Sequence, residues 1–231
     1  TVTSRSCGSG SLIHSQRKLV LTNYHVVGDS RTVLVFFPTY TDGEVEPKPR
    51  HYIDNAKTLG IRATVLAKSE AQDLALLELE RVPEGVEGLP LAAKPVGAGA
   101  KLYSVGASGI ELRDFSGTLW RLSSGEARAR NRHTARFSDG QVIDAMFLEN
   151  QKPINSGDSG GPTVNDTGAL VAVVSNKENV RATGRENVYR DVDLTEIQSF
   201  LTGYARSANF TWDGPTLASG GFTTDAKSLA K

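Results

Sequence analysis

The sequence is poor in the residues that build metal centres and redox sites. Cys7 is its only cysteine, so neither an intrachain disulfide nor a CxxC-type metal or redox site can form. Its four histidines, His14, His25, His51 and His133, are scattered along the chain and give no ligand cluster at workable spacing. We therefore expect neither a metal nor a cofactor.

An excess of charge of one sign is also lacking, and so are long apolar runs. Lys and Arg number 26, as do Asp and Glu, so the formal net charge is zero, and no overall field draws the protein to nucleic acid or to an anionic membrane. A bilayer-spanning helix needs about 20 apolar residues, whereas the longest apolar runs here are only a few residues, such as residues 171–174. Residues 1–7 lack the apolar core of a signal peptide. The sequence thus predicts no membrane span and no clear nucleic-acid binding.

Short β-rich runs recur between clusters of Gly, Pro, Asp and Asn, without any βαβ alternation. This pattern predicts an all-β sandwich or barrel. The predicted strands are residues 19–22, 32–37, 63–66, 74–79, 102–105, 118–122, 141–148, 170–175 and 188–192.

A segment rich in Pro, Gly and Ala, residues 89–99, separates two strand-rich halves. We predict domains at 1–92 and 93–203, the second ending in a helix at about 194–202, followed by a tail or linker at 204–231. Asp193 and Glu196 have the spacing of a capping box at the start of this helix, and Gly203 is its predicted stop.

Two segments are predicted to be loops. Residues 39–60, with an Asp-Gly pair and two prolines, are typical of a long surface loop. A basic run is predicted to be a solvated loop between two strands, or alternatively a site for an acidic partner or nucleic acid. It consists of Arg128, Arg130, Arg132, His133 and Arg136.

The strongest local signal is Asn155-Ser156-Gly157-Asp158-Ser159-Gly160-Gly161-Pro162. A serine becomes a nucleophile only when a base takes its proton and donors stabilise the resulting oxyanion, and flanking glycines allow both a tight turn and close approach of a substrate. A plain Ser/Gly-rich hairpin turn is the alternative. The nucleophile elbow of α/β-hydrolases is excluded, because Gly160-Gly161-Pro162 forbids the helix that must follow and no histidine lies beyond His133.

The base and its partner must then come from earlier in the chain. His25 lies where an apolar strand ends and turns into Gly28, and Asp73 begins the apolar run Asp73-Leu74-Ala75-Leu76-Leu77. A carboxylate can hold the imidazole tautomer that accepts the serine proton. Read singly, His25 is a packed strand-end histidine and Asp73 a turn-closing aspartate.

Taken together, these motifs are specific. The order His, Asp, Ser is that of the chymotrypsin-type fold, with separations of 73 − 25 = 48 and 159 − 73 = 86 residues. Thr22-Asn23-Tyr24-His25-Val26-Val27, the Asp73 motif and the Ser159 motif resemble those of the protease domain of the HtrA (Deg) branch of trypsin-like serine peptidases. The resemblance covers about residues 8–202.

The resemblance implies two six-stranded antiparallel Greek-key β-barrels with the active site in the cleft between them, plus a C-terminal helix. It implies His25 as general base, Asp73 as its orienting partner, and the N–H groups of Gly157 and Ser159 as an oxyanion hole. It also implies a hydrogen bond from Ser175 to Asp73.

Two features depart from the HtrA pattern. Asp158 stands where that branch has asparagine; in the digestive trypsin group this aspartate pairs with an N-terminal amine freed by cleavage, and no Ile-Val-Gly-Gly-like start exists here. HtrA proteins also carry PDZ domains after the protease, for which residues 204–231 are too few. The resemblance therefore does not extend to a cage-like assembly, and a place within a larger multidomain chain or complex is left open.

The resemblance places a primary substrate pocket at Pro153, Ile154, Ser175, Asn176 and Asn187. Apolar atoms at 153 and 154 favour small or medium aliphatic side chains, since a buried cation would lack a partner. A one-residue shift in the alignment would instead aim Glu186 into the pocket. The sequence thus predicts a serine endopeptidase acting on proteins or peptides, and the alternative is a catalytically idle trypsin-like domain that binds or scaffolds.

Overall fold

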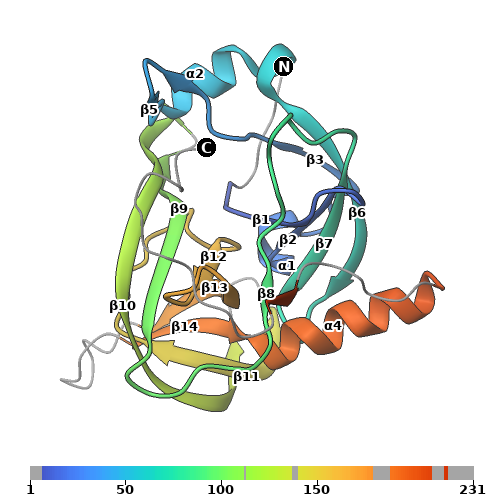
Figure 1. The fold of residues 1–231 in the computed structure, drawn as a ribbon, viewed down its shortest axis with the longest axis vertical. Helices are drawn as coiled ribbons and strands as arrows, with labels where there is room; N and C mark the ends of the chain where they lie inside the picture. Colours follow the sequence, from blue (N-terminus) through green and yellow to red (C-terminus); the bar gives the residue numbers. More distant parts are fainter. Residues whose placement is uncertain (1–6, 112, 137–139, 179–187, 210–215, 218–231) are drawn as a thin grey trace.

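The chain forms two large, mainly antiparallel sheets, a separate two-stranded hairpin and one long helix (Figure 1). The computed structural model describes residues 7–111, 113–136, 140–178, 188–209 and 216–217. As predicted, the protein is mostly β, with its main helix near the C-terminus.

The first sheet carries the N-terminal motifs. Its strand order is β1 (Ser11–His14), β2 (Leu19–Thr22), β7 (Leu74–Leu79), β6 (Ile61–Ser69) and β3 (Thr32–Val35). It therefore has five strands in the described part of the chain, against the six expected. All of β2 is buried, and β7 is buried except for Glu78, because both strands lie in the middle of the sheet.

The second sheet closes on itself. Its six strands are β9 (Lys101–Glu111), β10 (Ser116–Arg136), β11 (Val142–Asn150), β14 (Val188–Asp193), β13 (Leu170–Glu178) and β12 (Pro162–Val164). The last of these pairs with both β13 and β9, which completes the ring. The neighbouring order β12-β9-β10-β11 is a Greek key.

Two short strands attach to this second sheet. β8 (Leu91–Ala92) pairs in parallel with β13 on one side and with β15 (Thr216–Leu217) on the other. Residues 91–92 of β8 were assigned by sequence to the end of the first domain, but they pair with the second sheet. β15 lies in the segment 204–231, which was expected to be a tail. The remaining tail residues, 210–215 and 218–231, lie outside the described part.

The expected loop at 39–60 is instead a small folded unit. It contains the hairpin β4 (Tyr40–Thr41) and β5 (Glu44–Val45), then α2 (Pro49–Asp54) and α3 (Ala56–Leu59). Tyr52 is 1% exposed and packs edge-to-face against Trp120 of β10. Because this partner is 68 residues away in sequence, local pattern could not reveal that the segment has a core of its own.

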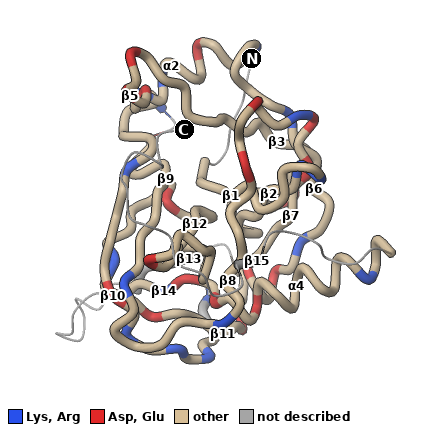
Figure 2. Tube along the Cα trace, viewed as in Figure 1, with Lys and Arg blue, Asp and Glu red and all other residues tan. Residues whose placement is uncertain are grey.

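The basic run is also not a loop. Residues 128–136 are part of β10, and pair with β11 from Ala129 to Arg136. Acidic residues of neighbouring strands bind it there: Arg130 pairs with Asp193, Arg132 pairs with Asp144, and His133 Nε2 lies 2.8 Å from Glu149 Oε1. Figure 2 shows the resulting mixture of basic and acidic residues along β10 and β11.

The helix α4 (Leu194–Ser207) is longer than predicted. Asp193 caps it by accepting a hydrogen bond from the Thr195 N–H. Glu196 instead binds β11 and the turn before β7, accepting from the Met146 N–H at 2.9 Å and from Gln72 Nε2 at 2.8 Å. Gly203 does not end the helix, because the buried face continues through it to Ala205.

The main hydrophobic core belongs to both sheets. One buried cluster joins Leu21 and Leu76 of the first sheet to Phe147 and Val173 of the second and to Ile197 of α4. A second cluster lies within the first sheet alone. No helix in the described residues is long and apolar enough to cross a bilayer.

Candidate active site

The sequence brings His25 and Asp73 together through strand pairing. His25 lies on α1 (Tyr24–Val27), which follows β2, and Asp73 is the last turn residue before β7. Because Thr22 pairs with Ala75, the two side chains meet at the same end of the sheet. His25 Nδ1 lies 2.9 Å from Asp73 Oδ2 and 3.0 Å from Oδ1.

Asp73 is fully buried and well supplied with donors. Its carboxylate accepts from the His25 N–H at 3.1 Å, from Ser175 Oγ at 2.8 Å and from Gln141 Nε2 at 3.4 Å. Asn23 Nδ2 donates to its carbonyl at 2.8 Å. A buried carboxylate is stable only with such partners, so this network fixes both the position of Asp73 and the orientation of His25.

Ser159 lies in the turn between β11 and β12 and is half-buried. Its Oγ donates to the carbonyl of Ser175 at 3.1 Å. Since the Ser175 hydroxyl donates to Asp73, the residue expected to support the aspartate touches both Asp73 and Ser159. The structure thus joins the Ser159 turn to the His25–Asp73 pair through one residue of β13.

Glycines are required on both sides of Ser159. Gly157 has φ +93° and Gly160 has φ +85°, where other residues are strained. A Cβ at Gly157 would lie 2.0 Å from the Ala107 carbonyl oxygen, and one at Gly160 would lie 2.2 Å from the Ser9 carbonyl oxygen. Sequence reasoning expected a tight turn here, and these contacts give its physical cause.

The peptide groups of this turn are anchored on one side. The Ser156 carbonyl accepts from the Gly109 N–H at 2.7 Å, and the Asp158 carbonyl accepts from the Gly161 N–H at 3.0 Å. In a trans peptide the N–H points opposite to the carbonyl. The directions of the Gly157 and Ser159 N–H groups are therefore set by fixed carbonyls.

Ser9 secures the same turn from the N-terminal side. Its Oγ donates to the Gly157 carbonyl at 2.8 Å and accepts from the Ala107 N–H at 2.9 Å, while its N–H donates to the Ser159 carbonyl at 2.8 Å. Sequence reasoning gave no sign of this role for Ser9.

Sequence reasoning missed two other partners as well. Gln141 reaches Asp73 at its first carboxylate oxygen, and Arg121 Nη2 lies 3.1 Å from Asp158 Oδ2. Both contacts span more than 30 residues, and Arg121 is placed by the pairing of β10 with β9, so no spacing rule would have found them.

The expected substrate-pocket residues lie in different environments. Ile154 and Ser175 are buried and Pro153 is exposed. Asn176 is on β13 with its side chain outside the described part, and Asn187 and Glu186 lie outside it altogether.

Cys7 is a poor rival to Ser159 as nucleophile. Burial raises the pKa of its thiol, and the negative charge of Glu111 adds to this effect. Because the thiolate is the reactive form, the shift keeps Cys7 in its inert protonated state at neutral pH. Among the described residues, no three His, Cys, Asp or Glu side chains are grouped so that they could hold a metal ion.

The sequence is similar to known proteins over most of its length. The family model described as "Trypsin-like peptidase domain" matches residues 8–173. A curated relative, "Probable periplasmic serine protease do/HhoA-like" of Haemophilus influenzae, is 25% identical over 169 residues, which are 73% of this chain. The chain spans only 30% of that relative's length.

The fold is similar to that of solved proteases. The Rv3671c protease in its inactive form aligns with a TM-score of 0.62 and 21% identity, covering 85% of this chain and 83% of that one. Its active form, from M. tuberculosis, aligns with a TM-score of 0.59 and 19% identity, covering 93% and 77%.

Proposed function

Because the chain belongs to the family of trypsin-like peptidase domains, we propose that it is a serine endopeptidase that cleaves peptide bonds through an acyl-enzyme on Ser159. The observation that carries this proposal is the buried Asp73 carboxylate, bonded at once to His25 Nδ1 and to Ser175, which in turn accepts from Ser159 Oγ. The catalytic group is then His25, Asp73 and Ser159.

The chemistry follows from the bond between His25 and Asp73. With Nδ1–H donated to the carboxylate, Nε2 carries the lone pair and takes the proton of Ser159 Oγ as that oxygen attacks the scissile carbonyl. The imidazolium formed is stabilised by Asp73 and gives its proton to the departing amine. Water, deprotonated by His25 in the same way, then releases the acyl group and restores the serine.

The oxyanion hole is assigned to the N–H groups of Gly157 and Ser159. Hydrogen bonds to the carbonyls on the other side of both peptides support this assignment, since donors held in place need no reorganisation as charge develops. The buried Ile154 supports small or medium aliphatic side chains before the cleaved bond. Dominant cleavage of a peptide library after Arg or Lys would contradict this specificity and point to Glu186.

Labelling with a fluorophosphonate probe, together with peptide hydrolysis, tests the proposal. We expect the parent protein to be labelled, and Ser159→Ala and His25→Ala to lose labelling and turnover. Ser156→Ala, in the same turn, and His51→Ala, in α2, serve as matched controls. An unlabelled, inactive but folded parent would instead support the idle binding or scaffold domain.

A further inference from the structure

Asp158, the residue before Ser159, is a buried carboxylate in need of a counter-charge. It is 5% exposed, and its Oδ2 accepts from the Asn155 N–H at 2.8 Å. Its Oδ1 lies against Gly106, where a Cβ would come within 2.4 Å of it. Burying an unpaired charge is costly, so what neutralises Asp158 bears directly on the neighbouring serine.

Arg121 of β10 supplies the charge. Its Nη2 lies 3.1 Å from Asp158 Oδ2, and no other cation pairs with Asp158 in the described part of the chain. The same nitrogen donates to the Pro153 carbonyl at 3.3 Å. One side chain therefore holds both ends of the segment from 153 to 158, which leads into Ser159.

A β-bulge aims Arg121 at this segment. The pairing of β10 with β9 shifts between Thr118 and Arg121, and Trp120 within the bulge has φ +60°. Arg121 is then directly opposite Gly106, the residue against which Asp158 packs. Bulges next to active sites commonly redirect a side chain in this way, and the small partner at 106 leaves room for the carboxylate.

We propose that Arg121 is a positioning residue for Ser159: its charge keeps Asp158 buried and thereby holds the nucleophile turn in its reactive arrangement. The inference rests on the proposed peptidase function. Without Arg121, Asp158 would turn toward water and displace Ser159 and the two oxyanion donors. Arg121 belongs to β10, in the same sheet as the strands β11 and β12 that flank the Ser159 turn. The turn is therefore ordered as soon as this sheet folds.

Neutralising each partner tests the inference. We expect Arg121→Ala to lower kcat by about 10- to 100-fold with little change in KM, since small misplacements at a reacting centre have effects of this size. Asp158→Asn removes the negative charge that Arg121 neutralises. Adding Arg121→Ala to Asp158→Asn should therefore change kcat by less than about threefold, because two residues that act through one contact have non-additive effects. Arg132→Ala, an exposed arginine on the same strand, should leave kcat unchanged.

The outcomes are distinguishable. If Arg121→Ala folds and retains parental kcat, the inference is wrong. It is equally wrong if Arg121→Ala costs tenfold or more in the Asp158→Asn background, because Arg121 would then act through another contact; this comparison holds even where Arg121→Ala alone does not fold. A parent whose hydrolysis survives Ser159→Ala would instead refute the proposed function.

Discussion

Asp73 draws its hydrogen-bond partners from three separate segments of the chain, contributing His25, Gln141 and Ser175. Its backbone has φ +52°, a conformation uncommon for residues other than glycine and often found at functional sites. The position is thus held by its surroundings, and its role can be tested by changing the carboxylate alone.

Replacing Asp73 by asparagine should remove the acceptor while keeping the shape. The amide would present a donor to His25 Nδ1, so the imidazole would carry its proton on Nε2 and fail to accept from Ser159. We expect kcat to fall by about 10⁴-fold, with the fold retained in circular dichroism. Asp29→Asn, on the exposed turn after α1, is the matched control, and a loss below tenfold for Asp73→Asn would argue against the proposed role.

Gly160 offers a second test at the residue scale. Gly160→Ala combines a positive φ, which costs about 1–2 kcal/mol for an L-residue, with a Cβ only 2.2 Å from Ser9 O and Thr22 Oγ1. Gly168→Ala has a similar positive φ, +77°, with nothing within 4 Å. Urea unfolding should therefore show a clearly larger loss of stability for Gly160→Ala; equal losses would mean that the contacts relax without cost.

The functional residues that could be predicted from the sequence are those that stand in short local motifs. His25, Asp73 and Ser159 stand in recognisable local patterns, and the structure brings the first two into contact. Gln141, Ser9 and Arg121 stand in no pattern, because their contacts are fixed only by strand register and by a bulge.

At the scale of elements, two apolar strands were predicted accurately, whereas the charged segment 128–136 was not recognised as a strand. The strands 19–22 and 74–79 were predicted with the bounds observed, because their runs of apolar residues are buried. Residues 128–136 were predicted as a loop because their charges look solvated, whereas acidic residues on β11 and β14 pair with Arg132 and Arg130.

The link between Asp193 and Arg130 should make α4 sensitive to acid. Burial favours the neutral form of Asp193, but the bidentate bond and charge of Arg130, with the bonds from Thr195, outweigh it and lower the pKa of this carboxyl. Such a group stabilises the fold fully above its unfolded pKa of about 4 and loses this contribution as the pH falls through the folded value.

We therefore expect Asp193→Ala to lower the free energy of unfolding by about 2–4 kcal/mol at pH 7, from the lost cap and the lost charged hydrogen bonds. The difference from the parent should shrink toward acid pH. Denaturant unfolding at pH 7 and below pH 4 measures both values, with Asp166→Ala as a control on an exposed turn. A difference that does not change with pH would contradict a role for the ionised carboxylate.

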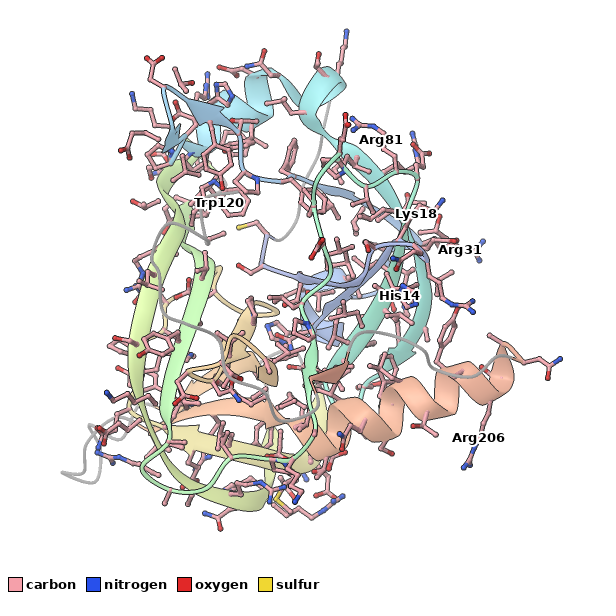
Figure 3. All side chains as sticks on the ribbon, viewed as in Figure 1. His14, Lys18, Arg31, Arg81, Trp120 and Arg206 are labelled. Carbon is pink, nitrogen blue, oxygen red and sulfur yellow. The ribbon has the colours of Figure 1, made fainter. Side chains whose placement is uncertain are left out.

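At the scale of the whole molecule, the two halves of the chain are in contact at a second place besides the shared core, between the unit at 39–60 and β10. The unit at 39–60, inserted between β3 and β6 of the first sheet, contacts the upper part of β10 (Figures 1 and 3). Trp120 Nε1 donates to the Glu46 carbonyl at 3.2 Å and to Tyr52 Oη at 3.1 Å, and the Leu119 N–H donates to the Pro47 carbonyl at 3.0 Å.

This contact holds the same bulge that presents Arg121, so its loss should be felt at Ser159. Trp120→Ala should lower the free energy of unfolding by about 3–5 kcal/mol, as deletion of a large packed aromatic does. Because the bulge relaxes, we also expect kcat to fall in the protein that remains folded. Tyr40→Ala, on an exposed strand of the same unit, should do neither.

Trp120→Phe separates the two effects, because it keeps the ring packing against Tyr52 but removes the indole donor shared by the Glu46 carbonyl and Tyr52 Oη. If the bulge is held mainly by packing, kcat should stay within about threefold of the parent while stability drops by about 1 kcal/mol for the lost hydrogen bond. Adding Asp158→Asn to Trp120→Ala decides the route: once the charge is gone, Arg121 no longer matters, and the fall in kcat caused by Trp120→Ala should largely disappear. A fall that persists would mean that the 39–60 unit acts on the active site by a path other than Arg121.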